Sequence, residues 1–208
     1  QRLAFEPPDL RGLLGREGVS TIGGVVAANA SGPRRVQVGA ARDACLGVRF
    51  VDGGGTVVKN GGRVMKNVTG YDLVKLLAGS RGVLGVLSEV SLKVQALPEA
   101  EATLMVEGLD DAAGLAALRA ALGSPFDVSG AARHSGRSLV RVEGMAGSVA
   151  YRVGRLRDRI GGEVAVVEGE ASAALWREVR DVVPLHAHAG EVWRIATLAT
   201  ASASASLS

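Results

Sequence analysis

The stretch Thr21-Ile-Gly-Gly-Val-Val-Ala-Ala-Asn-Ala-Ser-Gly-Pro33 is the most informative part of the 208-residue sequence. Its paired glycines are followed by small residues, so the main chain can come close to a ligand and offer N–H groups to a phosphate without an intervening side chain. A simpler interpretation is a glycine turn that leads into a helix of small residues, and for an isolated Gly-Gly pair that interpretation is preferred. Taken alone, the stretch does not establish a function.

A second glycine-rich stretch, Gly79-Ser-Arg-Gly-Val-Leu-Gly-Val-Leu-Ser-Glu89, spaces its glycines evenly. A dinucleotide-binding fingerprint would lie between a strand and a helix. Here a predicted helix, Tyr71 to Ala78, precedes the glycines and a predicted strand, Val83 to Val94, follows them. The sequence therefore excludes a Rossmann motif. It predicts another close approach of main chain to ligand, with Val86 and Leu87 supplying backbone hydrogen bonds and apolar walls.

Two regions of the chain predict different architectures. Residues 1–98 read as short strands separated by glycine turns, including a hairpin in which Asp52-Gly-Gly-Gly55 joins two strands. Residues 99–196 predict a βαββαβ order, which is that of a ferredoxin-like antiparallel sheet with two helices on one face. Its expected strands are 103–107, 126–132, 138–143 and 163–167. Its expected helices are 110–122, capped by Asp110, and 147–160, and a further helix covers 171–182. The Ala/Ser-rich tail, residues 197–208, has nothing to bury and is predicted to be disordered.

Composition limits the partners and the location. The 24 Lys and Arg against 21 Asp and Glu leave a net charge of +3, and the arginines are interleaved with acids, so no nucleic-acid partner is expected. A single cysteine, Cys45, cannot form an internal disulfide, which favours a reducing compartment and a cytoplasmic protein. No apolar run reaches the roughly 18 residues of a membrane span, and residues 1–15 lack the pattern of a signal peptide.

A third segment, Gly61-Gly-Arg-Val-Met-Lys-Asn-Val-Thr-Gly-Tyr-Asp-Leu73, lies between the first two. In this order and at these separations, the three segments resemble the FAD-linked oxidases of the vanillyl-alcohol oxidase type, which carry a PCMH-type FAD-binding domain. Within that family they are most similar to the FAD-binding E subunits of bacterial glycolate oxidases. The resemblance is strong over about residues 15–98 and continues weakly to Val192-Trp-Arg-Ile195.

The resemblance implies an α+β fold and a division of the chain. The second half of a PCMH-type FAD-binding domain, residues 1–98, is followed by a partial ferredoxin-like cap domain, residues 99–196. The family's diphosphate loop, Pro-x-Gly-x-Gly-Ser/Thr, does not precede Gln1. An N-terminally truncated fragment is therefore expected.

The resemblance also implies a set of residues that contact FAD. Three matched segments make up that set: Ser20, Thr21, Ile22, Gly23 and Gly24 against the flavin and its pyrophosphate; Ala28, Asn29, Ala30 and Ser31 along the cofactor; and Gly82, Val83, Leu84, Gly85, Val86 and Leu87 on the adenosine side. Lys66, Asn67 and Tyr71 match a motif close to the same site. For Tyr71, a half-buried aromatic ring that anchors the start of a helix is an equal alternative.

The activity implied is oxidation of a small 2-hydroxy acid, glycolate to glyoxylate, with hydride transfer to flavin. A sister flavin subunit and an iron–sulfur subunit are the implied partners, and they could hold the protein at the periphery of the inner membrane. Two alternatives stay open: another FAD-linked enzyme such as a D-lactate dehydrogenase, or a non-catalytic scaffold subunit. The dehydrogenase signature His-x-Gly-Asp-Gly-Asn-x-x-His is missing, which counts against the first. No catalytic base is assigned.

Single residues add little chemistry. His186 and His188 could share one face of a strand, but two ligands without a third favour a plain loop, so no metal is predicted. His134 is expected in a solvated polar turn. The pair Arg34-Arg35 either binds a phosphate or a partner carboxylate, or is an exposed turn. Cys45, Trp176 and Trp193 are expected in the core, as inert packing groups.

Overall fold

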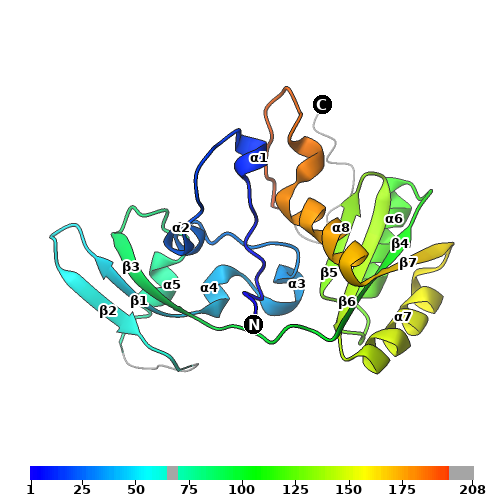
Figure 1. Ribbon diagram of the computed structural model, residues 1–208, viewed down its shortest axis with the longest axis horizontal. Coiled ribbons are helices and arrows are strands. Elements are labelled where there is room, and N and C mark those ends of the chain that lie inside the picture. Colours follow the sequence, from blue (N-terminus) through cyan, green and yellow to red (C-terminus); the bar gives the residue numbers. More distant parts are fainter. Residues whose placement is uncertain (65–69, 197–208) are drawn as a thin grey trace. The chain divides into compact units, whose positions relative to one another are not determined.

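The computed structural model describes residues 1–64 and 70–196 (Figure 1). It divides into two compact units, one made of Gln1–Arg11 and Gly15–Leu97, the other of Gly12–Leu14 and the residues from Pro98 onward. The predicted tail, residues 197–208, lies outside the described residues. Within the described ranges no helix is both long and apolar enough to cross a bilayer.

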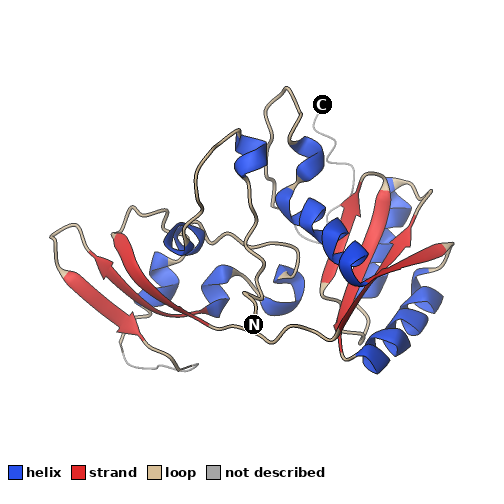
Figure 2. Cartoon of the chain, in the orientation of Figure 1, coloured by secondary structure: helices blue, strands red, loops and turns tan. Residues whose placement is uncertain are grey.

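The first unit is a small three-stranded antiparallel sheet with short helices (Figure 2). The strand order is β2-β1-β3. Its elements are α1 (Arg11–Leu14, whose last three residues group with the second unit), α2 (Ile22–Ala27), α3 (Arg35–Val38), α4 (Ala41–Ala44), β1 (Cys45–Val51), β2 (Val57–Gly61), α5 (Leu73–Leu77) and β3 (Val86–Leu92).

The hairpin predicted around residues 52–55 is confirmed. Strands β1 and β2 pair antiparallel, with Val51 opposite Val57. The carboxylate of Asp52 closes the turn, because its Oδ1 accepts hydrogen bonds from the backbone N–H groups of Gly54 (2.9 Å) and Thr56 (2.8 Å). An aspartate that bonds to the backbone two residues on is typical of such turns.

Helix α5 and strand β3 are both shorter than predicted, and both begin later. Helix α5 begins at Leu73, not Tyr71, because Asp72 caps it: Oδ1 of Asp72 accepts from the N–H of Lys75 at 3.0 Å. Strand β3 begins at Val86, not Val83. The backbone at Gly85 has a φ of +155°, and a Cβ there would lie 2.6 Å from the Val51 carbonyl oxygen. Glycine is therefore needed at Gly85, where the chain enters β3.

The core of the first unit lies between the sheet and helices α2 and α5. It consists of the buried residues Val26, Cys45, Val48, Phe50, Val74, Leu77 and Ala78. Cys45 is in this core as predicted, and burial raises the pKa of its thiol. The thiolate form is disfavoured there, since a charge is costly in apolar surroundings.

The second unit confirms the predicted βαββαβ order. Its elements are β4 (Ala100–Val106), α6 (Asp111–Leu122), β5 (Gly130–His134), β6 (Arg137–Gly144), α7 (Ala146–Ile160) and β7 (Val164–Glu168), followed by α8 (Gly169–Asp181) and the 3-10 turn η1 (Val183–Leu185). The strands form an antiparallel sheet of order β5-β6-β4-β7, the arrangement of a ferredoxin-like fold. As expected, Asp110 caps α6, its Oδ1 accepting from Ala113 N at 2.7 Å.

The two faces of this sheet are covered differently. Leu104 and Val142 point to one face, where they pack with Leu118 of α6 and Leu156 of α7. Because side chains alternate along a strand, Thr103 points to the other face. There α8 covers the sheet with Trp176, whose Nε1 donates to Thr103 Oγ1 at 2.7 Å and whose ring lies 4.4 Å from the Arg141 guanidinium. The predicted inward position of Trp176 is confirmed.

Three predictions for the second unit are wrong. Strand β5 begins at Gly130, not Phe126, because Asp127 has a φ of +47° that interrupts an extended chain. His134 ends that strand and is buried, with Nε2 3.6 Å from Glu178 Oε2 on α8, so it does not lie in a solvated turn. Trp193 follows η1 in a segment without helix or strand, and it is exposed.

Candidate functional site

The first predicted ligand segment forms the short helix α2. Thr21 caps this helix, its Oγ1 accepting from the Gly24 N–H at 3.1 Å. Gly23 and Gly24 therefore lie within a helical turn, as the simpler interpretation of the stretch proposed. Val26 is fully buried and fixes the helix against the sheet, whereas Ser20, Thr21 and Ile22 are exposed.

The structure brings the first and second glycine-rich segments together. The N–H of Gly79 donates to Val26 O at 3.1 Å, and the N–H of Arg81 donates to Ala27 O at 2.8 Å. Leu87 of β3 also lies close to α2. A Cβ on Gly23 would be 3.9 Å from the Leu87 Cβ, which is an ordinary contact distance. Two stretches more than 50 positions apart in the sequence therefore form one surface.

Two of the predicted cofactor residues use their side-chain oxygens to hold the backbone in place. Asn29 adopts a φ of +50°, and its side-chain Oδ1 accepts from the N–H of Arg42 at 2.8 Å. The hydroxyl of Ser31 accepts from Ala41 N at 2.8 Å and donates to Asn29 O at 3.1 Å. These bonds fix the start of α4 beside the end of α2. The side-chain oxygens of Asn29 and Ser31 are engaged within the chain.

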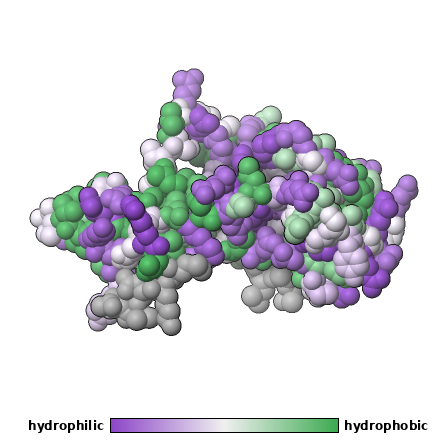
Figure 3. Space-filling view, turned by 60° about the horizontal axis from the view of Figure 1, so that its bottom comes forward, coloured by the Kyte–Doolittle hydropathy of each residue, from purple (hydrophilic) through white to green (hydrophobic). Residues whose placement is uncertain are grey.

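The remaining predicted residues form an exposed surface with apolar character. Four hydrophobic side chains stand out: Ile22 is 44% exposed, Leu84 43%, Val86 71% and Val83 81%. Three of them, Val83, Leu84 and Val86, follow Gly82, which is exposed. Hydrophobic side chains also interrupt the hydrophilic surface on the face shown in Figure 3. Exposed apolar groups beside accessible main chain are typical of a ligand surface.

Of the three predicted residues in the third segment, the structure describes only Tyr71. Lys66 and Asn67 lie outside the described residues. Tyr71 is 89% exposed, so the half-buried anchor considered for it is wrong. Asn60, at the end of β2, does the anchoring: its Nδ2 donates to Tyr71 O at 3.2 Å and its Oδ1 accepts from Leu73 N at 3.1 Å. Sequence reasoning missed Asn60, although an asparagine beside Gly61-Gly62 is a common turn signal.

Arg34 is neither a phosphate ligand nor part of an exposed turn. Its side chain is 3% exposed and its guanidinium lies 3.0 Å from the Glu6 carboxylate, which also accepts from the Arg34 N–H at 2.8 Å. Arg35 beside it is exposed. The sequence separates the two partners by 28 positions, so neither interpretation could include this pair.

His186 and His188, near the end of the described chain, do not form a metal-binding pair. His186 lies with Nε2 2.9 Å from Asp181 O, and His188 is exposed. Among the described residues, no three His, Cys, Asp or Glu side chains are grouped as a metal site would require.

Known proteins with similar sequences carry an FAD binding domain or are FAD-linked oxidoreductases. Residues 12–61 match the family model of the FAD binding domain. The solved structure of an alkyldihydroxyacetonephosphate synthase superposes with a TM-score of 0.63 over 86% of this chain and 39% of that chain, at 18% sequence identity, which supports the fold. In sequence and in fold the chain is thus similar to FAD-linked oxidases, as the motifs predicted.

Within that class, the similarity to glycolate oxidase subunits is extensive. Over 197 residues the chain is 38% identical to glycolate oxidase subunit GlcE of Escherichia coli (strain K12), covering 94% of this chain and 51% of that protein. It is 38% identical over 111 residues to glycolate oxidase subunit GlcD of Bacillus subtilis (strain 168), covering 52% of this chain and 23% of that protein. A D-lactate dehydrogenase of Anaerostipes hadrus is 40% identical over 97 residues, 46% of this chain and 20% of that protein. The chain thus spans about half the length of the first relative.

The residues of the exposed surface fit FAD. A large cofactor that binds to main-chain atoms needs glycines with open space around them. Gly82 meets this need, because a Cβ at this position would have no neighbouring atom within 4 Å. The apolar side chains of Val83 and Val86 are available to a ring system. The side-chain oxygens of Asn29 and Ser31 fix the shape of this surface.

Proposed function

We propose that this chain is the FAD-binding part of a flavin-dependent oxidoreductase that acts on a small 2-hydroxy acid. More specifically, it serves as the FAD-binding subunit of a glycolate oxidase-type complex, which oxidises glycolate to glyoxylate. The observation that carries the proposal is the 38% identity to a glycolate oxidase subunit over 94% of this chain.

The surface formed by α2 and the loop before β3 is the proposed cofactor site. The carry-over from the family places Ser20 to Gly24, Ala28 to Ser31 and Gly82 to Leu87 along FAD. The hydrogen bonds from Gly79 to Val26 and from Arg81 to Ala27 support this placement, because they hold the first and second glycine-rich segments next to each other. Lys66 and Tyr71 remain proposed neighbours of the same site.

Bound FAD would supply the two-electron acceptor for oxidation of the substrate's CH–OH group. This chain would bind and orient the cofactor: the main chain at Gly82 lets it come close, and the exposed side chains of Val83 and Val86 exclude water from its adenosine side. None of the described residues is assigned the role of catalytic base. The sister flavin subunit is therefore a proposed alternative place of substrate oxidation.

The partners and the location belong to the same proposal. A sister flavin subunit and an iron–sulfur subunit are the proposed partners, and the electrons would leave through the iron–sulfur subunit. The complex would be cytoplasmic, as the lone Cys45 favours. The similarity to a D-lactate dehydrogenase over 97 residues keeps that substrate as the second candidate. A scaffold subunit that binds partners without holding FAD is the non-enzymatic alternative.

Two measurements separate these functions. The absorption spectrum of the purified chain, together with flavin released on denaturation, reports FAD occupancy: stoichiometric flavin excludes the scaffold alternative, and a flavin-free chain that also fails to take up added FAD contradicts the proposal. Co-expression with the candidate partner subunits, followed by dye reduction with glycolate or D-lactate, then identifies the substrate. The glycolate assignment fails if glycolate does not reduce the dye.

A further inference from the structure

Asn60, at the end of β2, lies outside the three segments that resemble the FAD-linked oxidases, since the third of them begins at Gly61. It pairs with Val48 of β1, a core residue, and shares a sheet face with Val58, which packs against the same core. A polar amide at the end of this apolar face is costly unless its donor and its acceptor are both used. The hydrogen-bond partners of Asn60 therefore show what this residue does.

Both polar atoms of the Asn60 amide bind to one tight turn. Nδ2 donates to Tyr71 O at 3.2 Å, and Oδ1 accepts from Leu73 N at 3.1 Å. The same two backbone groups also bond to each other, with Leu73 N 3.0 Å from Tyr71 O. Asp72 between them has a φ of −81° and a ψ of 79°, which are close to the angles of an inverse γ-turn. One side chain thus clamps both ends of the turn that carries Tyr71.

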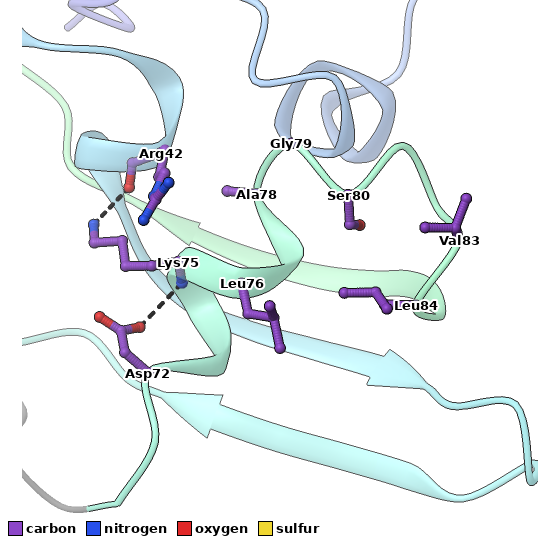
Figure 4. Close-up of a pocket in the computed structure, with 9 residues that line it drawn as sticks. All are labelled: Arg42, Asp72, Lys75, Leu76, Ala78, Gly79, Ser80, Val83 and Leu84. Atoms are coloured by element: carbon purple, nitrogen blue, oxygen red, sulfur yellow. Dashed lines mark hydrogen bonds between the residues drawn. The ribbon is translucent and has the colours of Figure 1, made fainter.

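Helix α5, which follows this turn, is also fixed by contacts that do not involve Asn60. Its Val74 and Leu77 are buried in the core of the first unit. On its other side, Lys75 Nζ donates to the backbone carbonyl oxygen of Arg42 (Figure 4). Loss of the Asn60 amide should therefore release the turn and leave the helix in place.

The clamped turn borders the proposed cofactor site. Asp72 lines a pocket of about 650 Å³, and Val83 and Leu84, from the segment proposed to bind FAD, line the same pocket (Figure 4). Tyr71 directly precedes Asp72 and is 89% exposed, so its ring is available to a ligand on the Asp72 side of the pocket. An aromatic ring on a fixed backbone contacts a ligand at a low cost in conformational entropy.

We infer that Asn60 is a positioning residue of the proposed cofactor site: by clamping both ends of the turn, its amide holds Tyr71 where the ring meets FAD. This inference rests on the proposed function, in which Tyr71 is a neighbour of FAD. Asn60 acts on the cofactor only through Tyr71. The affinity for FAD therefore depends on Asn60 only while the Tyr71 ring is present.

Titration with FAD, followed by the change in flavin fluorescence, tests this dependence. It is carried out on the native 208-residue chain, on Asn60→Ala, on Tyr71→Ala and on the double variant. Asn60→Ala should weaken FAD binding about fivefold, the loss expected for about one neutral hydrogen bond. In the Tyr71→Ala background, the same substitution should change the affinity by less than about twofold. A merely structural role would give the same loss in both backgrounds, because independent effects add.

Two further variants separate the position of Tyr71 from stability. Asn60→Asp keeps an acceptor for the Leu73 N–H but has no donor for Tyr71 O, so it should weaken FAD binding as much as Asn60→Ala. Salt at about 0.5 M screens the charge that it adds. Asp110→Ala is the matched control: it also removes a side chain that bonds to a backbone N–H at the start of a helix, but α6 lies in the second unit. It should leave the FAD affinity within about twofold, because its lost cap affects only the stability of that helix.

The outcomes distinguish this inference from the proposed function. An unchanged FAD affinity in Asn60→Ala, or an equal loss with and without the Tyr71 ring, overturns the role of Asn60 while FAD binding by the native chain stands. A loss in Asp110→Ala as large as in Asn60→Ala also overturns it, because lowered stability then explains both. A native chain that takes up no FAD contradicts the proposed function, and the positioning role falls with it.

Discussion

The side-chain Oδ1 of Asn29 accepts a hydrogen bond from the backbone N–H of Arg42 at 2.8 Å, and this bond ties the end of α2 to the start of α4. The proposed cofactor surface depends on it, since α2 carries the first glycine segment. Asn29 also holds a φ of +50°, a conformation that asparagine tolerates better than most residues.

Asn29→Ala should therefore lower the free energy of unfolding by about 2 kcal/mol, from the lost hydrogen bond and the positive φ together. Asn29→Asp keeps the acceptor and should cost less than half as much, and Asn29→Gly should lie between them because glycine relieves the φ. Urea unfolding followed by circular dichroism measures the three values. Equal losses in Asn29→Ala and Asn29→Asp would show that the bond to Arg42 contributes nothing.

Arg34 should be the most sensitive arginine of the first unit. Its buried guanidinium pairs with Glu6 at 3.0 Å, so Arg34→Ala leaves a mostly buried carboxylate without this cation. Breaking a buried pair from one side costs about 3–5 kcal/mol. The neighbouring Arg35→Ala removes an exposed charge and should change stability by no more than about 0.5 kcal/mol. Chemical denaturation of the two variants tests the difference, and similar values would contradict the structural assignment.

Local signals in the sequence were sufficient for most of the fold. The hairpin at Asp52, the cap at Asp110 and the order of strands and helices in the second unit all rest on neighbouring residues, and all are confirmed. Two of the errors, at Arg34 and His134, have a common cause. Arg34 finds its partner 28 residues away, and His134 is buried because α8 lies over the end of β5, so both depend on tertiary contacts that periodicity does not encode.

The candidate site was predictable as a set of segments but not as a set of side chains. Motif order identified the two glycine stretches that meet at Gly79 and Val26. It did not distinguish ligand-facing residues from supporting ones: Asn29 and Ser31 turn their oxygens to the backbone of α4. Their position in a shared motif is explained equally well by either role, and only the three-dimensional contacts separate the two.

The two tryptophans should report the second unit separately. Trp176 is 2% exposed and Trp193 is 74% exposed. Trp193→Phe should therefore leave a blue-shifted fluorescence emission that acrylamide quenches poorly, whereas Trp176→Phe should leave a red-shifted emission that is readily quenched. Trp176→Phe also removes the donor to Thr103 Oγ1 and should cost about 1–2 kcal/mol of stability. Readily quenched emission from Trp193→Phe would contradict the packing of α8 on the sheet.

The single thiol should make stability depend on pH in the alkaline range. Burial raises the pKa of Cys45 in the folded protein, while an unfolded thiol ionises near its ordinary pKa of about 8.5. Above that pH the unfolded state has lost its proton while the folded state retains it, so stability is full below it and falls as the pH rises. Between about pH 7 and pH 9.5, the native chain should lose more stability than Cys45→Ala, which has no thiol to ionise. The other titrating groups are the same in both proteins and cancel in the comparison. Parallel pH profiles of urea unfolding would show that burial does not hold the Cys45 thiol in its neutral form.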